Sequence, residues 1–97
     1  MIKEITLRGE IDKLNAEHLI LCKNDPKEGF YKSNQLLKKA EASNYSKGIG
    51  ESLRNLAFSS QLLGLIPEGY EFSNKAVEIF EEIGDKKGIA LSLNVVG

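Results

Sequence analysis

The chain has 97 residues, a formal net charge of −1, and 41% apolar and 28% charged residues, which fits one globular domain. Its charges are mixed rather than clustered, and no stretch approaches the ~20 apolar residues of a membrane span, so neither a nucleic-acid nor a membrane partner is expected. A lone cysteine, Cys22, indicates a reducing compartment or indifference to redox state. Since the N-terminus also lacks a signal-peptide core, a cytoplasmic location is expected.

The first segment has helical spacing. Apolar residues and one histidine recur every three or four positions, at Leu7, Ile11, Leu14, His18 and Leu21. This spacing predicts a helix from about residue 3 to residue 23.

A second helix is predicted after a clear start signal. Asp25 can accept backbone N–H bonds as the cap, Pro26 fits the first helical position, and Glu28 stands where the acid of a capping box would be. The pattern continues to about Ala42, and Asn44 is a plausible left-handed residue at the following turn.

Three more helices follow. The third is expected to begin near Ser46 and to end at Gly64, and the fourth to begin at Pro67 and close at Gly84. A fifth is expected over about residues 86–97. Because the connections are only a few residues long, neighbouring helices are predicted to be antiparallel hairpins.

The sequence repeats itself at a spacing of forty residues. An overlay at that spacing matches Asn15 with Asn55, Glu28-Gly29-Phe30 with Glu68-Gly69-Tyr70, Ser33-Asn34 with Ser73-Asn74, Lys47-Gly48-Ile49 with Lys87-Gly88-Ile89, and Ser52-Leu53 with Ser92-Leu93. Periods of roughly 20–50 residues are typical of stacked repeats, in which one unit cannot bury its apolar face alone. Gly29 and Gly69, inside predicted helices, are expected to mark close helix contacts.

The hairpin pattern resembles the tetratricopeptide repeat (TPR). Leu53-x-x-Leu56-Ala57 and Leu93-x-x-Val96-Gly97 are similar to the family's large-x-x-Leu-Gly phrase, and Gly69-x-x-x-Ser73-x-x-Ala76 is similar to its second helix. The period is longer than the usual ~34 residues. Longer repeats with a phrase like that of residues 79–90 resemble those of bacterial signalling proteins, such as sensor histidine kinases, diguanylate or adenylate cyclases and regulators.

The resemblance implies an all-α, TPR-like superhelix of about five helices in a single domain over residues 1–97. Repeat one would cover about residues 3–44, repeat two about 46–84, and the first helix of a truncated third repeat about 86–97. Solenoids normally finish with a polar capping helix, and this last segment is apolar. We therefore expect either a fragment of a longer protein or a homodimer that pairs through the C-terminal helix.

In TPR domains the first helix of each repeat lines a concave groove. Carried over by repeat position, the resemblance implies that a partner contacts Asn15, His18, Glu51, Arg54, Asn55, Phe58, Gln61, Leu62 and Asn94. An Asn ladder at Asn15 and Asn55 could hold an extended peptide backbone, and Arg54 could pair with a carboxylate. Phe58 offers an aromatic anchor.

Catalytic and metal sites are not expected. His18 and Cys22 lie one helical turn apart, but a structural zinc site needs about four ligands, and the chain has no other Cys or His. Gly48-Ile49-Gly50 lacks the third glycine and the preceding strand of a dinucleotide loop. The sequence thus favours a non-catalytic interaction or sensor module without a cofactor, which binds a peptide or protein in its groove. The alternative is a structural unit that only assembles with its own copies.

Overall fold

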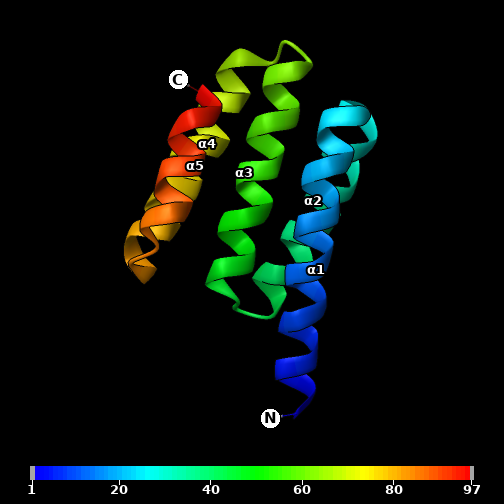
Figure 1. The fold of residues 1–97 in the computed structure, drawn as a ribbon, viewed down its shortest axis with the longest axis vertical. Helices are drawn as coiled ribbons and strands as arrows, with labels where there is room; N and C mark the ends of the chain where they lie inside the picture. The colour runs from blue at the N-terminus through cyan, green and yellow to red at the C-terminus, as the bar shows by residue number, and fades with distance from the viewer. Residues whose placement is uncertain (1, 97) are drawn as a thin grey trace.

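The computed structural model describes residues 2–96, and these residues form five α-helices and no strand. Figure 1 shows their order along the chain. Their bounds are α1 Ile2–Asn24, α2 Pro26–Ala42, α3 Ser46–Leu62, α4 Ile66–Ile83 and α5 Lys86–Val96. The predicted all-α fold is confirmed. The predicted helix ends lie within about two residues of the observed ones, apart from the predicted end of the fifth helix at Gly97, which lies outside the described residues.

The helices begin at a regular spacing. Helices α2 to α5 start at Pro26, Ser46, Ile66 and Lys86, so successive starts lie 20 residues apart. The residue before each helix start makes the same backbone contact: its carbonyl oxygen accepts the N–H of the residue four positions later. These residues are Asp25, Tyr45, Leu65 and Asp85. The forty-residue period seen in the sequence is therefore made of two helix-and-turn units of equal length.

The turns use the residues that the sequence singled out. Asn44, Gly64 and Gly84 have positive φ values of 51°, 78° and 71°, a region that L side chains other than Asn enter rarely. Asp25 caps α2 by accepting the Glu28 N–H at 3.3 Å. The Asp25 N–H itself donates to the Leu21 carbonyl at 2.7 Å, which leaves no role for Glu28 as the returning partner of a capping box.

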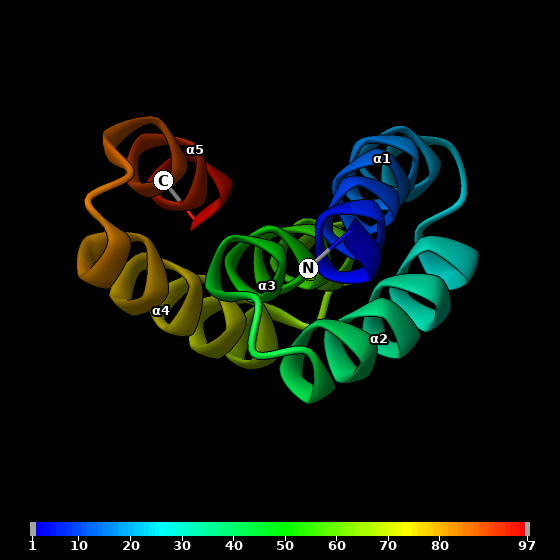
Figure 2. The ribbon, with the colours of Figure 1, turned by 90° about the horizontal axis from the view of Figure 1, so that it is seen from below.

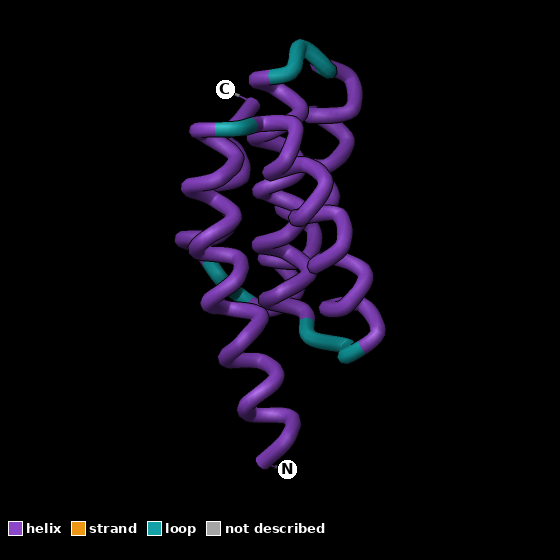
Figure 3. Tube along the Cα trace, turned by 90° about the vertical axis from the view of Figure 1, so that its right-hand side faces the viewer, coloured by secondary structure: helices purple, strands orange, loops and turns teal. Residues whose placement is uncertain are grey.

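The helices form two rows. Viewed along the helices, α1, α3 and α5 make an inner row and α2 and α4 an outer row (Figure 2). Neighbours along the chain run antiparallel, with the connections at the two ends of the array (Figure 3). Helix α3 lies at the centre and packs against each of the other four helices. The flanking helices α1 and α5 rise on either side of α3, so the inner face is concave (Figure 2).

Two apolar clusters stabilise the rows. One contains Ile11, Leu36 and Ala40 from α1 and α2, and the other contains Leu53, Ala76 and Phe80 from α3 and α4. Ile49 packs against both clusters. Burying a large apolar side chain stabilises a fold by roughly 1.5–3 kcal/mol, so these clusters hold the hairpins together.

Much of the remaining core is small and polar. Six serines are fully or almost fully buried: Ser33, Ser52, Ser59, Ser60, Ser73 and Ser92. Between α1 and α3, the Asn55 amide donates to the Asn15 carbonyl oxygen at 3.0 Å and to the Asn15 side-chain oxygen at 3.3 Å. Asn15 in turn donates to the Gly48 carbonyl oxygen at 3.3 Å. Small side chains let the helices approach closely. Half of the buried serine hydroxyls are hydrogen-bonded, those of Ser33, Ser52 and Ser73. The hydroxyls of Ser59, Ser60 and Ser92 are buried without a partner.

The two interior glycines of the outer row differ. A Cβ at Gly29 would lie 2.6 Å from the Cys22 Cα, so α1 and α2 touch there through their backbones. A Cβ at Gly69 would meet nothing nearer than 3.5 Å, which is an ordinary contact. Both glycines therefore lie at helix contacts, as expected, but only at Gly29 is the approach too close for a side chain.

One aromatic ring separates α3 from α5. The ring of Phe80, on α4, is 1% exposed and lies where the Cβ atoms of two residues would otherwise be. A Cβ at Gly50 of α3 would come within 2.8 Å of this ring, and a Cβ at Gly88 of α5 would overlap it. The ring thus occupies the space between two glycines on neighbouring inner helices.

Candidate functional site

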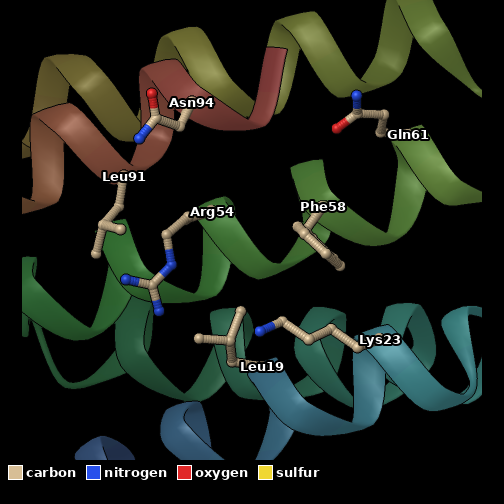
Figure 4. A pocket seen from close by; sticks show the side chains of 7 residues that line it. All are labelled: Leu19, Lys23, Arg54, Phe58, Gln61, Leu91 and Asn94. Atoms are coloured by element: carbon tan, nitrogen blue, oxygen red, sulfur yellow. The ribbon is translucent and has the colours of Figure 1, made fainter. Parts of the chain in front are cut away.

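The concave face holds a groove, here called the inner groove, made of two adjoining cavities. The first, about 220 Å³, is lined by Leu19, Lys23, Arg54, Phe58, Gln61, Leu91 and Asn94 (Figure 4). The second, about 470 Å³, is lined by Ala16, Leu19, Lys47, Glu51, Arg54, Phe80, Asp85, Lys87, Gly88 and Leu91. Because Leu19, Arg54 and Leu91 belong to both, the cavities join into one groove over α3, between α1 and α5.

The first cavity forms the apolar end of the inner groove. Leu19 from α1, Phe58 from α3 and Leu91 from α5 approach it from three helices (Figure 4). Lys23, Gln61 and Asn94 supply polar groups around it. Such a concave apolar surface with a few polar groups at its edge suits one bulky apolar side chain of a ligand.

The second cavity forms the charged end. Lys47 forms an ion pair with Asp12 of α1 at 3.6 Å. Asp85 accepts the Gly88 N–H at 2.9 Å, which caps the start of α5. These two interactions position charged side chains from α1, α3 and the start of α5 around Glu51.

Arg54 lies at the junction of the two ends. Its side chain is only 7% exposed, and one terminal nitrogen, Nη2, donates to the Asn55 side-chain oxygen at 3.4 Å. Its Nε is buried without a hydrogen-bond partner. Burial lowers the pKa of the Arg54 guanidinium, and the charges of Glu51 and Asp85 oppose that change. A buried guanidinium with an unsatisfied donor is an incomplete interaction site.

Glu51 lies one turn before Arg54 on the same face of α3. Its Oε1 is buried and has no hydrogen-bond partner. Burial is the main cause that raises the pKa of the Glu51 carboxyl, with smaller increases from Asp12 and Asp85 and opposing effects from Arg54 and Lys47. Among residues 2–96, no ion pair within 4 Å joins Glu51 to Arg54.

Five of the nine predicted partner-binding residues line the inner groove: Glu51, Arg54, Phe58, Gln61 and Asn94. Asn15 and Asn55 do not, because both are fully buried and bonded to each other between α1 and α3. The predicted Asn ladder exists, but it joins two helices of the chain instead of facing a ligand. Leu62 is 52% exposed and does not line the described cavities.

His18 lies on the other flank of α1. It lines a separate cavity between α1 and α2, with Leu14, Lys32, Gln35, Leu36 and Lys39. The side chain is 8% exposed and its Nδ1 is buried without a partner. Burial, followed by the charge of Lys32, lowers the pKa of His18, while Glu17 raises it. Its predicted neighbour Cys22 is buried and contacts the Ser33 hydroxyl and the Asn55 carbonyl oxygen.

At the charged end, sequence reasoning missed the groove residues Lys47, Phe80, Asp85, Lys87 and Gly88. It also missed those of α1: Ala16, Leu19 and Lys23. On this helix Ile11, Asn15, His18 and Cys22 form the buried stripe, and the groove residues lie one position further along the chain from that stripe. The sequence therefore did contain a signal for these groove residues: they form a second row with helical spacing, beside the buried stripe. Repeat position alone could not find it, because the edge helix α1 lines the groove with its flank, whereas the central helix α3 lines it with its concave-side face.

No group of three or more metal-ligating side chains comes together within the described residues. None of the helices there is long and apolar enough to cross a bilayer. Comparisons with family models, with curated proteins and with solved structures gave no match to this chain. The inner groove is thus the feature on which a functional proposal can be based.

Proposed function

We propose that this chain is a non-catalytic interaction module that binds a peptide or protein segment in the inner groove. The observation that carries the proposal is Arg54, a nine-tenths buried cation with an unsatisfied donor at the centre of a concave, three-helix surface. A ligand would place an apolar side chain against Leu19, Phe58 and Leu91 and a polar group on Arg54. The resemblance to TPR repeats agrees with this use and suggests a cytoplasmic bacterial regulatory protein as the setting.

A nuclear magnetic resonance screen tests the proposal. The ¹⁵N-labelled chain would be titrated with pools of short peptides that carry one bulky apolar residue. We expect shift changes to cluster on the groove residues Leu19, Arg54, Phe58 and Leu91, and Phe58→Ala to weaken binding roughly tenfold or more, because buried aromatic anchors dominate such contacts. Tyr31→Ala is the control, since Tyr31 is exposed on α2 and does not line the groove. Peptides that bind Phe58→Ala as tightly as the unchanged chain would contradict the proposal.

Self-assembly is the second candidate, and one observation favours it. Leu93 on α5 is 52% exposed and, unlike Leu91, does not line the inner groove. Large exposed apolar side chains on one helix often mark a protein contact. Under this alternative, the sedimentation coefficient would rise with concentration and Leu93→Lys would abolish the rise. A concentration-independent monomer would exclude it.

A further inference from the structure

Glu51 and Arg54 face the same cavity with opposite charges, and both remain incompletely bonded. They are three residues apart on α3, so they are neighbours on one helical face. Glu51 Oε1 and Arg54 Nε are buried without partners, and the two side chains form no ion pair with each other. A buried polar group without a hydrogen-bond partner destabilises the protein, and more strongly if the group is charged. A ligand that satisfies both groups would remove that destabilisation.

The charge of the groove favours an anion. Its lining contains four cationic residues, Lys23, Lys47, Arg54 and Lys87, and two acidic residues, Glu51 and Asp85. The chain as a whole has a net charge of −1, so the positive charge is local to this face. A positive concave surface attracts negatively charged ligands.

We propose that Arg54 and Glu51 form a carboxylate-binding site in which Glu51 takes up a proton when the ligand binds. The Arg54 guanidinium donates hydrogen bonds to the ligand carboxylate. Glu51 accepts a proton from solvent, and its O–H then donates to the same carboxylate, so the two acids share one hydrogen bond and only one negative charge remains beside Arg54. This inference rests on the proposed function and names the ligand class: a peptide, or peptide-like acid, with a bulky apolar group next to a carboxylate.

The surroundings of Glu51 suit such a proton uptake. From α3 it is faced by Arg54 and Lys47, from α1 by Asp12, and from the start of α5 by Asp85, with Lys87 lining the same cavity. Burial already raises the pKa of Glu51 above its ordinary value. A ligand carboxylate adds a second negative charge nearby, and like charges raise the pKa of an acid further.

Affinity for the carboxylate ligand should decrease as the pH rises. In the bound state the pKa of Glu51 is higher than in the free state, so the complex holds more protons than the free protein. Affinity is therefore greatest at acidic pH and falls as the pH rises above the free-state pKa, by at most about tenfold per pH unit. The fall ends above the bound-state pKa.

Two small probes isolate the carboxylate. N-acetylphenylalanine carries a phenyl ring and a carboxylate that stays ionised above about pH 4, and its primary amide has the same shape without the charge. Dissociation constants would be measured between about pH 5 and about pH 8 from shift changes of the Leu19, Phe58 and Leu91 signals. We expect the acid to bind more tightly than the amide, to lose about tenfold in affinity across this range, and the amide to show no such loss.

Glu51→Gln is the decisive variant, because glutamine can donate a hydrogen bond without a proton from solvent. We expect it to bind the acid at about pH 8 roughly tenfold more tightly than the unchanged chain does, with no pH dependence. The control is Glu68→Gln, since Glu68 is exposed on α4 away from the groove. Arg54→Gln should abolish the preference for the acid, with circular dichroism to confirm that it folds.

Several outcomes overturn the inference. Equal affinities for acid and amide would show that Arg54 does not select a carboxylate. A pH dependence that survives in Glu51→Gln would assign the proton to another group, such as His18 on the far flank of α1. If peptides bind the groove and neither probe does, the carboxylate site fails and the interaction function stands. If the acid binds with the expected pH dependence and no peptide does, the site stands and the peptide-binding function fails.

Discussion

At the scale of single residues, Asn15 and Asn55 show what repetition can and cannot reveal. The overlay at forty residues paired them, and in the structure they are joined by a direct hydrogen bond. The prediction that their side chains face a ligand was wrong. An amide that donates and accepts hydrogen bonds suits a buried helix contact as well as a bound peptide. The sequence does not state which face of an inner helix is covered by its neighbour, so burial had to come from the structure.

Replacing Asn55 tests this internal role. Asn55→Ala removes the bonds to Asn15 and the acceptor for Arg54, and leaves buried polar atoms without partners. We expect the free energy of unfolding to fall by about 2 kcal/mol and the melting temperature by roughly 10 °C. Urea and thermal unfolding would measure both. Asn74→Ala, at an exposed position on α4, should change neither appreciably, and equal effects of the two variants would argue against the amide contact.

At the scale of the elements, local chemistry determined most of the helix ends. Caps, prolines and left-handed turn residues depend on a few neighbouring residues, so Pro26, Asn44 and Gly84 could be interpreted from sequence alone. The groove surface of α1 could not, because the face that an edge helix turns toward a groove depends on how the rows curve. The difference between Gly29 and Gly69 could not be predicted from the sequence either. The two glycines match in the overlay, but α2 lies closer to α1 at Gly29 than α4 lies to α3 at Gly69.

These two glycines provide a matched pair of variants. Gly29→Ala would place a methyl group against the α1 backbone at Cys22, which must then move, so we expect a loss of about 2 kcal/mol or more. Gly69→Ala meets only ordinary contacts, and the gain in helix propensity should leave stability unchanged or raise it by up to about 1 kcal/mol. Chemical unfolding would compare them. A loss at Gly69 as large as that at Gly29 would mean that α3 and α4 pack more tightly than described.

At the scale of the whole molecule, the fold is an array in which contacts reach only neighbouring units. Among the described residues, no close backbone packing joins α1 or α2 to α4 or α5, and the backbones of both sides pack against α3. Side chains do connect the two outer helices directly, as in the edge-to-face pair of Phe30 and Phe72 with ring centres 6.0 Å apart. Stability in such arrays is close to a sum of local terms.

Hydrogen exchange of the backbone amides should follow this arrangement. We expect α3, which has neighbours on every packed side, to exchange most slowly, and α5 and the first turns of α1 to exchange fastest, because the end helices open without disrupting the rest. Exchange followed by nuclear magnetic resonance would give the opening free energy for each helix. Uniform protection across all five helices would instead indicate one cooperative unit.

The ring of Phe80, on the outer-row helix α4, determines the spacing between two helices of the inner row. Since the ring lies between Gly50 and Gly88, its thickness sets how far α5 stands from α3, and that separation is the width of the charged end of the groove. A smaller side chain at this position would let the two walls close. Under the proposed function, ligand selectivity would then change although no exposed groove side chain had been replaced. Under the proposed function, adaptation to a new ligand can therefore begin at a buried residue of the outer-row helix α4, which solvent scarcely reaches.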